Sequence, residues 1–184
     1  MTPYTVAVFI HVVGVLGLFT AMGLEWVLVA RLRRIATVEQ ARDWLSLLGV
    51  IRRLSPASLA AILVSGLYMM FSTWGGVAWI IVAFVAVLLL PPLGMIAGLR
   101  LPRVQRDLEG HSGPLPAELR QRLDQPLFLA SIQIRTAIAV GIVFLMTNKP
   151  DALASAIAIA AAIVIGLGLS VPTLNRRRAS QTPT

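Results

Sequence analysis

The 184-residue chain contains no cysteine, only two histidines and a single lysine. The absence of cysteine excludes disulfide bridges, thiolate metal sites and thiol nucleophiles. Charged residues make up 13% of the sequence, whereas hydrophobic residues make up 57%. A water-soluble globule of this size needs more polar surface than that. The composition therefore excludes a soluble protein and favours a membrane protein.

Motifs of common enzyme chemistry are also absent. The sequence has no glycine-rich phosphate loop, no zinc-protease or serine-hydrolase motif and no pair of carboxylates arranged for acid–base catalysis. Because no thiol is available, any redox chemistry would have to use a bound cofactor. The sequence favours a role other than catalysis.

Five long apolar stretches divide the chain, at about 4–30, 57–71, 77–99, 127–146 and 152–171. A helix of roughly 20 apolar residues crosses the hydrocarbon core of a bilayer. The sequence therefore predicts an all-α fold, a single membrane domain over residues 1–184 that forms a five-span transmembrane helical bundle. The first stretch has no basic segment before it and no cleavage site after it, so we expect it to be retained as a helix.

Basic residues indicate the orientation of this bundle. Segments 31–56, 100–126 and 172–184 hold 14 arginines, while the two remaining connections hold only Lys149. Cytoplasmic loops are enriched in arginine and lysine, so the pattern predicts an N-out/C-in protein of a bacterial cytoplasmic membrane. The net charge of +8 is spread over short segments next to apolar spans, which indicates anionic lipid headgroups, and not nucleic acid, as partners.

Local signals predict where these helices begin and end. Thr37–Gln40 has the pattern of a capping box and predicts a short interfacial helix or an extension of a neighbouring span. Ser55 and Pro56 are expected to begin the second span, and Pro91-Pro92 should kink the third. Further signals predict an outer turn at Trp74-Gly75-Gly76, a helical turn or two over 117–124 and a helix cap at Pro150-Asp151.

His11 is an ionisable side chain in the outer third of the first span, and such groups are candidates for function. It is interpreted either as a ligand of haem, quinone or metal, or as a hydrogen-bonding partner of a neighbouring helix. Met69, Met70 and Met146 end their spans at a similar depth. Imidazole and thioethers together can bind haem iron or Cu(I), so His11, Met69 and Met70 form a candidate metal site.

Arg135 lies near the middle of the fourth span, where a charge requires a partner. Three interpretations are open: an ion pair with Glu25, binding of an anionic group such as a haem propionate or a lipid phosphate, and extension toward the cytoplasmic headgroups. His11, Arg135 and Glu25 are therefore the candidate cofactor-binding residues, with haem as the possible cofactor.

The fifth span carries a small residue at every fourth position, which permits close approach of another helix. We expect this ridge to pack span five on the bundle, and it could also dock a second copy or a partner subunit. The ridge consists of Ala154, Ala158, Ala162, Gly166 and Ser170.

The first span, Phe9-Ile-His11-Val-Val-Gly14-Val-Leu-Gly17 with Gly23-Leu-Glu25 and an arginine-rich loop after it, resembles the opening of a group of small bacterial integral membrane proteins. That group includes the copper-resistance protein D-like membrane domain and the membrane-bound protoporphyrinogen oxidase. The resemblance covers mainly residues 6–34 and implies a helical bundle in which His11 is a haem or copper ligand. The chain departs from the oxidases in having no lysine within a span.

Three hypotheses of function follow. The first is a membrane protein that binds a haem-like or other anionic cofactor near His11 and Arg135. The second is a small permease for copper or another solute, and the third is a structural subunit of a larger membrane complex.

Overall fold

The structure, a computed structural model, describes residues 2–179, with the backbone alone for 96–98 and 172–179. It consists of the helices α1 (Pro3–Leu32), α2 (Val38–Met69), η1 (Met70–Trp74), α3 (Ala78–Leu88), α4 (Leu90–Asp107), α5 (Ala117–Leu123), α6 (Pro126–Asn148) and α7 (Ala152–Ala179). The described residues include five helical segments long and apolar enough to cross a membrane. The predicted five-span all-α bundle is thus confirmed, and the chain is a multi-pass membrane protein.

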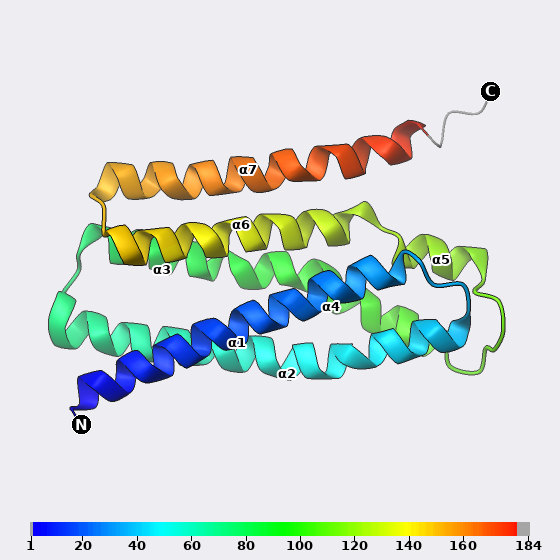
Figure 1. The fold of residues 1–184 in the computed structure, drawn as a ribbon, viewed down its shortest axis with the longest axis horizontal. Coiled ribbons are helices and arrows are strands. Elements are labelled where there is room, and N and C mark those ends of the chain that lie inside the picture. Colours follow the sequence, from blue (N-terminus) through cyan, green and yellow to red (C-terminus); the bar gives the residue numbers. More distant parts are fainter. Residues whose placement is uncertain (1, 180–184) are drawn as a thin grey trace.

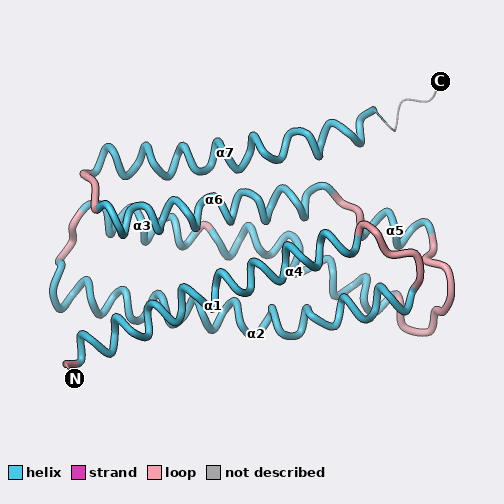
Figure 2. The backbone as a smooth tube through the Cα atoms, in the orientation of Figure 1, coloured by secondary structure: helices cyan, strands magenta, loops and turns pink. Residues whose placement is uncertain are grey.

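The helices run antiparallel along one long axis, with the two termini at opposite ends of the bundle (Figure 1). Helix α1 packs along α2, and α7 packs chiefly on α6 at one edge of the molecule. The connecting loops gather at the two ends, apart from a short break between α3 and α4 (Figure 2).

Helices occupy most of the segments 31–56 and 100–126, which lie together at the arginine-rich end of the bundle. Helix α2 begins at Val38, α4 continues to Asp107, and α5 occupies much of the remaining connection. Their apolar side chains form one buried cluster with α1 and α6, which includes Leu45, Leu108 and Phe128. The short helical elements predicted in these two segments are thus present, and they are longer than expected because their amphipathic faces bury apolar side chains in this cluster.

Pro56 does not begin the second span, as Ser55-Pro56 led us to expect, but lies inside α2. An internal proline removes a backbone hydrogen bond and costs about 3 kcal/mol. The preceding segment buries Val38, Ala41, Leu45 and Leu48 at helical spacing. Burial of several such side chains exceeds the cost of one proline, so the helix continues through it and the capping-box segment becomes an extension of span two.

Other local predictions are confirmed. The helix breaks at Leu89, between α3 and α4, where Pro91 and Pro92 cannot donate backbone hydrogen bonds. Gly75 adopts a left-handed backbone with φ of 66° and forms the outer turn. The Asp151 carboxylate accepts the Ala154 N–H at 2.8 Å and caps α7.

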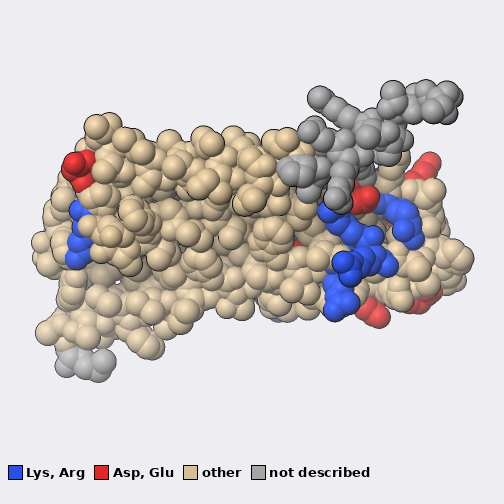
Figure 3. Space-filling view, turned by 45° about the horizontal axis from the view of Figure 1, so that its top comes forward, with Lys and Arg blue, Asp and Glu red and all other residues tan. Residues whose placement is uncertain are grey.

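The two ends of the molecule differ in charge, as the number of arginines in each connecting segment indicated. Figure 3 shows lysine and arginine side chains concentrated near one end of the visible face, with a small group at the other. The small group corresponds to Lys149, in the connection between α6 and α7. Arg176, Arg177 and Arg178 of the predicted tail have side chains outside the described residues.

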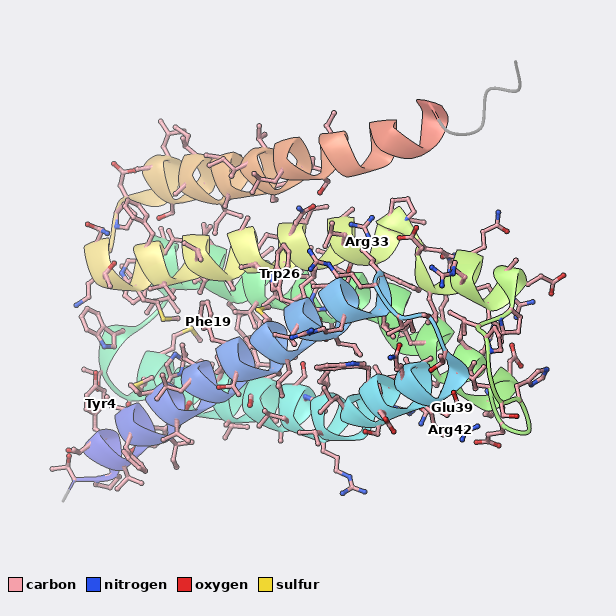
Figure 4. All side chains as sticks on the ribbon, turned by 45° about the vertical axis from the view of Figure 1, so that its right-hand side comes forward. Tyr4, Phe19, Trp26, Arg33, Glu39 and Arg42 are labelled. Atoms are coloured by element: carbon pink, nitrogen blue, oxygen red, sulfur yellow. The ribbon has the colours of Figure 1, made fainter. Side chains whose placement is uncertain are left out.

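The α1–α2 connection and the α4–α5 connection, both at the arginine-rich end, are joined by hydrogen bonds. The Val38 N–H donates to the Gly113 carbonyl at 3.0 Å, and the Leu115 N–H donates to the Ala36 carbonyl at 2.9 Å. The Glu39 carboxylate accepts the Gly113 N–H at 3.0 Å. Glu39 and Arg42 lie together at the start of α2 (Figure 4). These hydrogen bonds fix the loop after α4 on the first turn of α2.

Acidification should weaken this attachment. The Gly113 N–H, together with the backbone N–H of Glu39 itself, lowers the pKa of Glu39 below its usual value of about 4.5. A carboxylate with a lowered pKa stabilises the fold above its unfolded-state pKa, and the contribution disappears as pH falls through the folded-state value. We expect Glu39→Gln to lower the melting temperature slightly at pH 7, and the difference should shrink as pH falls below 4.5 and vanish only below the lowered folded-state pKa of Glu39. Glu118→Gln, at an exposed carboxylate on α5, is the control and should show a smaller pH-dependent difference in the same detergent melts.

The small-residue ridge of the fifth span faces α6 in this chain. Ala162, Gly166 and Ser170 are buried, Ala158 is half-buried and Ala154 is exposed. The Ser170 hydroxyl contacts Gln133 of α6 at 3.0 Å. The ridge thus packs span five on the bundle as expected, and a partner helix could reach most of it only by displacing α6.

Two glycines of α7 provide a matched test of this packing. A Cβ atom on Gly166 would lie 2.7 Å from the Ile134 Cα of α6, whereas one on Gly168 would meet no atom within 4 Å. Because a backbone atom cannot rotate away, Gly166→Ala should lower the free energy of unfolding by about 1–3 kcal/mol. Gly168→Ala should raise it by up to about 1 kcal/mol through helix propensity. Unfolding in mixed micelles would measure both, and equal effects of the two substitutions would contradict this α6–α7 contact.

Candidate functional sites

His11 lies on the buried face of α1 and is 8% exposed. Its Nδ1 atom lies 3.1 Å from the Ser65 hydroxyl of α2. Gly66 of α2 packs against the imidazole, and a Cβ there would lie 3.4 Å from the His11 Cε1 atom. The interpretation of His11 as a hydrogen-bonding partner of a neighbouring helix is confirmed.

The hydrogen bonds around Ser65 assign the tautomer of His11. The Ser65 hydroxyl has one proton, and its 2.5 Å contact with the Ala61 carbonyl is shorter than its contact with the imidazole. Donation of that proton to Ala61 leaves the Ser65 oxygen able to accept a hydrogen bond from the His11 Nδ1, and in a neutral imidazole this arrangement makes Nε2 the unprotonated nitrogen. Among the described residues, the buried Nε2 atom has no hydrogen-bond partner.

His11 lines a pocket of about 200 Å³ between α1, α2, η1, α3 and the end of α6, which we call the outer pocket. Three thioethers line the same pocket, from Met69, Met70 and Met146. The π-helical turn η1 continues directly from Met69 and places Met70 and Trp74 on the pocket wall. His11 and the methionines that the sequence places at a similar depth thus line one pocket.

Aromatic side chains close the outer pocket toward the outer end of the bundle. The Trp74 and Trp79 rings pack edge to face with centroids 5.7 Å apart. The Trp74 Nε1 donates to the Tyr4 hydroxyl at 3.1 Å, and the Lys149 ammonium lies 4.3 Å from the Trp74 ring centroid. Tryptophan side chains are enriched at membrane–water interfaces, and a position of these two rings near the end of the bundle agrees with that preference.

Arg135 of α6 forms an ion pair with Glu25 of α1. Its Nη1 lies 2.7 Å from Oε2 and its Nη2 lies 3.4 Å from Oε1. The side chains are 5% and 18% exposed, respectively. Of the three interpretations of Arg135, the pair with Glu25 is the one that the structure confirms.

The ion pair borders a second pocket, of about 290 Å³, between α1, α2, α4 and α6, which we call the inner pocket. Gly94 of α4 lies against the guanidinium, so that a Cβ there would be 3.3 Å from the Arg135 Cζ. Trp26 lies partway along α1 (Figure 4), and its Nε1–H donates to the Thr136 hydroxyl at 3.1 Å. Thr136 directly follows Arg135 in α6.

His11 and Arg135 line different pockets. On α1, His11 and Glu25 are fourteen residues apart, which corresponds to about 21 Å along the helix. The candidate residues therefore divide into an outer site at His11 and an inner site at Arg135 and Glu25.

Sequence reasoning missed Ser65, Gly66 and Gly94, and it counted Arg52 only as a marker of orientation. Small and polar residues within apolar spans were a signal for the first three, but they do not reveal which helix they face. Among the described residues, no three His, Cys, Asp or Glu side chains lie together as a possible metal site.

Comparison with known proteins assigns neither a family nor a function to this chain. The chain matches no protein-family model, no curated protein and no solved structure.

Proposed function

We propose that the chain is a copper-handling protein of a bacterial cytoplasmic membrane, oriented N-out/C-in, that binds Cu(I) in the outer pocket. The observation that carries this proposal is the buried His11 Nε2 atom, which has no hydrogen-bond partner among the described residues, on a side chain that lines the same pocket as three methionines. The distribution of 14 arginines toward one end supports the orientation, which places the outer pocket nearer the extracytoplasmic side.

The donor set favours a soft monovalent metal ion. Thioethers and imidazole are ligands for Cu(I), whereas Zn(II) prefers thiolate, imidazole and carboxylate in groups of three or four. In metal sites, the histidine usually donates its other ring N–H to a second group that holds the ring in place. Ser65 provides that function for His11 here.

The same nitrogen atom could ligate a haem iron, but the charge of the pocket disfavours it. Among the described residues that line the outer pocket, no arginine is present to receive a propionate. A single cofactor bound by both His11 and Arg135 is supported still less, because the two residues line different pockets.

Anaerobic titration of the detergent-purified chain would test the proposal. Cu(I) would be supplied in competition with a chromogenic chelator, and Zn(II) would be titrated in parallel. An absorbance spectrum of protein purified from haem-replete cells would show whether haem is bound. We expect about one Cu(I) per chain, no competition from Zn(II) and no Soret band. A Soret band without Cu(I) binding would assign the site to haem instead, and failure to bind either would refute the proposal.

A further inference from the structure

The inner pocket combines an apolar wall with a few charged groups. Leu18, Met22, Leu59 and Met95 belong to the apolar part, while Glu25, Arg52 and Arg135 contribute the charges. Pockets that are mostly apolar with a small number of placed polar groups are typical of ligand-binding sites. Neither the His11 site nor the proposed binding of Cu(I) involves this pocket.

Arg135 does not satisfy all of its hydrogen-bonding capacity through Glu25. It is 4% exposed, and among the described residues its Nε–H has no acceptor. A buried polar group without a partner is destabilising, and the penalty is larger for a charged group. Gly94 packs closely against the guanidinium from the α4 side and lines the same pocket.

Arg52 adds a second positive charge at a similar depth. Contacts of His11 with Ser65 and of Gly17 with Ser58 set the antiparallel register of α1 and α2, which places Arg52 level with Glu25. Among the described residues, no carboxylate lies within ion-pair distance of Arg52. The inner pocket is therefore lined by two arginines, the buried Arg135 and the exposed Arg52, and by one carboxylate, Glu25, so that its formal charge is +1.

We propose that the inner pocket binds an amphiphile with one anionic head group, either a carboxylate or a phosphate. The head group lies between Arg52 and Arg135, and the apolar chain extends along the pocket wall formed by α2 and α4. An anion at this point neutralises the excess charge and accepts hydrogen bonds from guanidinium groups, which are strong donors to carboxylate and phosphate.

The mouth of the pocket supports entry from the arginine-rich end. Arg52 and Leu99 line both the inner pocket and a neighbouring surface groove, where Arg103, Arg106 and Glu109 also lie. An anionic head group that moves from the inner membrane interface along this groove would meet several arginines before it reaches Arg135.

Native mass spectrometry of the full chain in detergent would test the proposal with three probes. Oleate has a single chain and a carboxylate, phosphatidylglycerol has two chains and a phosphate, and oleyl alcohol has the same chain as oleate without the charge. Arg52→Gln removes the charge at the mouth. Arg53→Gln is the matched control, because Arg53 is the exposed neighbour that does not line the pocket.

We expect saturable binding of one molecule of oleate or phosphatidylglycerol and weaker binding of oleyl alcohol. Arg52→Gln should weaken the anionic probe about tenfold, as loss of one charge-assisted hydrogen bond would, while Arg53→Gln should leave it unchanged. Preference for oleate would identify a fatty acid as the source of the anion, and preference for phosphatidylglycerol a phospholipid. Equal binding of the alcohol, equal effects of the two arginine substitutions or no saturable binding would overturn the proposal.

Discussion

Glu25→Gln is expected to lower the free energy of unfolding by about 3–5 kcal/mol, because it leaves the buried Arg135 guanidinium without its counter-charge. The nearest Arg135–Glu25 distance is 2.7 Å, and the Arg135 side chain is only 5% exposed. Unfolding of the variant in mixed micelles, compared with the unmodified chain, measures the loss.

A double-mutant cycle separates the ion pair from other consequences of each substitution. Arg135→Met should also be destabilising, because it leaves the carboxylate without its counter-charge. The double variant Glu25→Gln/Arg135→Met should lose less than the sum of the single variants, by about 2–3 kcal/mol. Strict additivity would show that the two side chains do not stabilise one another.

The exposed pair between Arg33 and Asp124 provides the control cycle. Its nitrogen and oxygen atoms are 3.0 Å apart, but the side chains are 35% and 45% exposed. Solvent screens such a pair, and its coupling energy should be below about 1 kcal/mol. A coupling as large as that of Glu25 with Arg135 would indicate that burial is not the source of the difference.

The ion pair also shows which parts of a site the sequence can predict. Arg135 and Glu25 are 110 residues apart, but each was placed in depth by counting along an apolar helix. A charge inside a span needs a partner, and few opposite charges exist at that depth. Composition and depth alone were therefore enough to propose the pair.

Contacts that depend on the rotation of a helix were not predictable in this way. Ser65 faces His11, and Gly94 faces Arg135. Each span is apolar on nearly every side, so hydrophobic periodicity does not show which face of α2 or α4 is turned inward. The helices and their order could be read from the sequence, whereas the pockets required the packing.

Pro56 illustrates a different limit. A proline after serine is a common helix start, and the local signal was interpreted in that way. The structure continues the helix through Pro56 because distant segments, including Leu108 directly after α4 and Phe128 of α6, build a core with residues before it. Local preference was overridden by tertiary burial, which a signal of a few residues does not contain.

His11→Ala is expected to lower the affinity for Cu(I) by at least about 100-fold, because it removes the nitrogen donor of the proposed site. His11→Met should restore much of this affinity, since a thioether is also a ligand for Cu(I). If His11 only held α1 against α2, His11→Met would not restore the affinity for Cu(I). Anaerobic competition titrations of the purified variants measure the affinities, and gel filtration verifies that each variant is folded.

Ser65→Ala tests the tautomer on which the proposal depends. Without the Ser65 hydroxyl, the His11 Nδ1 loses its acceptor and the imidazole is no longer fixed with Nε2 unprotonated. Loss of such a supporting hydrogen bond typically lowers metal affinity about 10–100-fold. Ser58→Ala is the matched control, because Ser58 is equally buried on α2 but lines neither pocket. If both serine variants bind Cu(I) as the unmodified chain does, the hydroxyl does not position the imidazole, and the assignment of Nε2 as the metal ligand loses its basis.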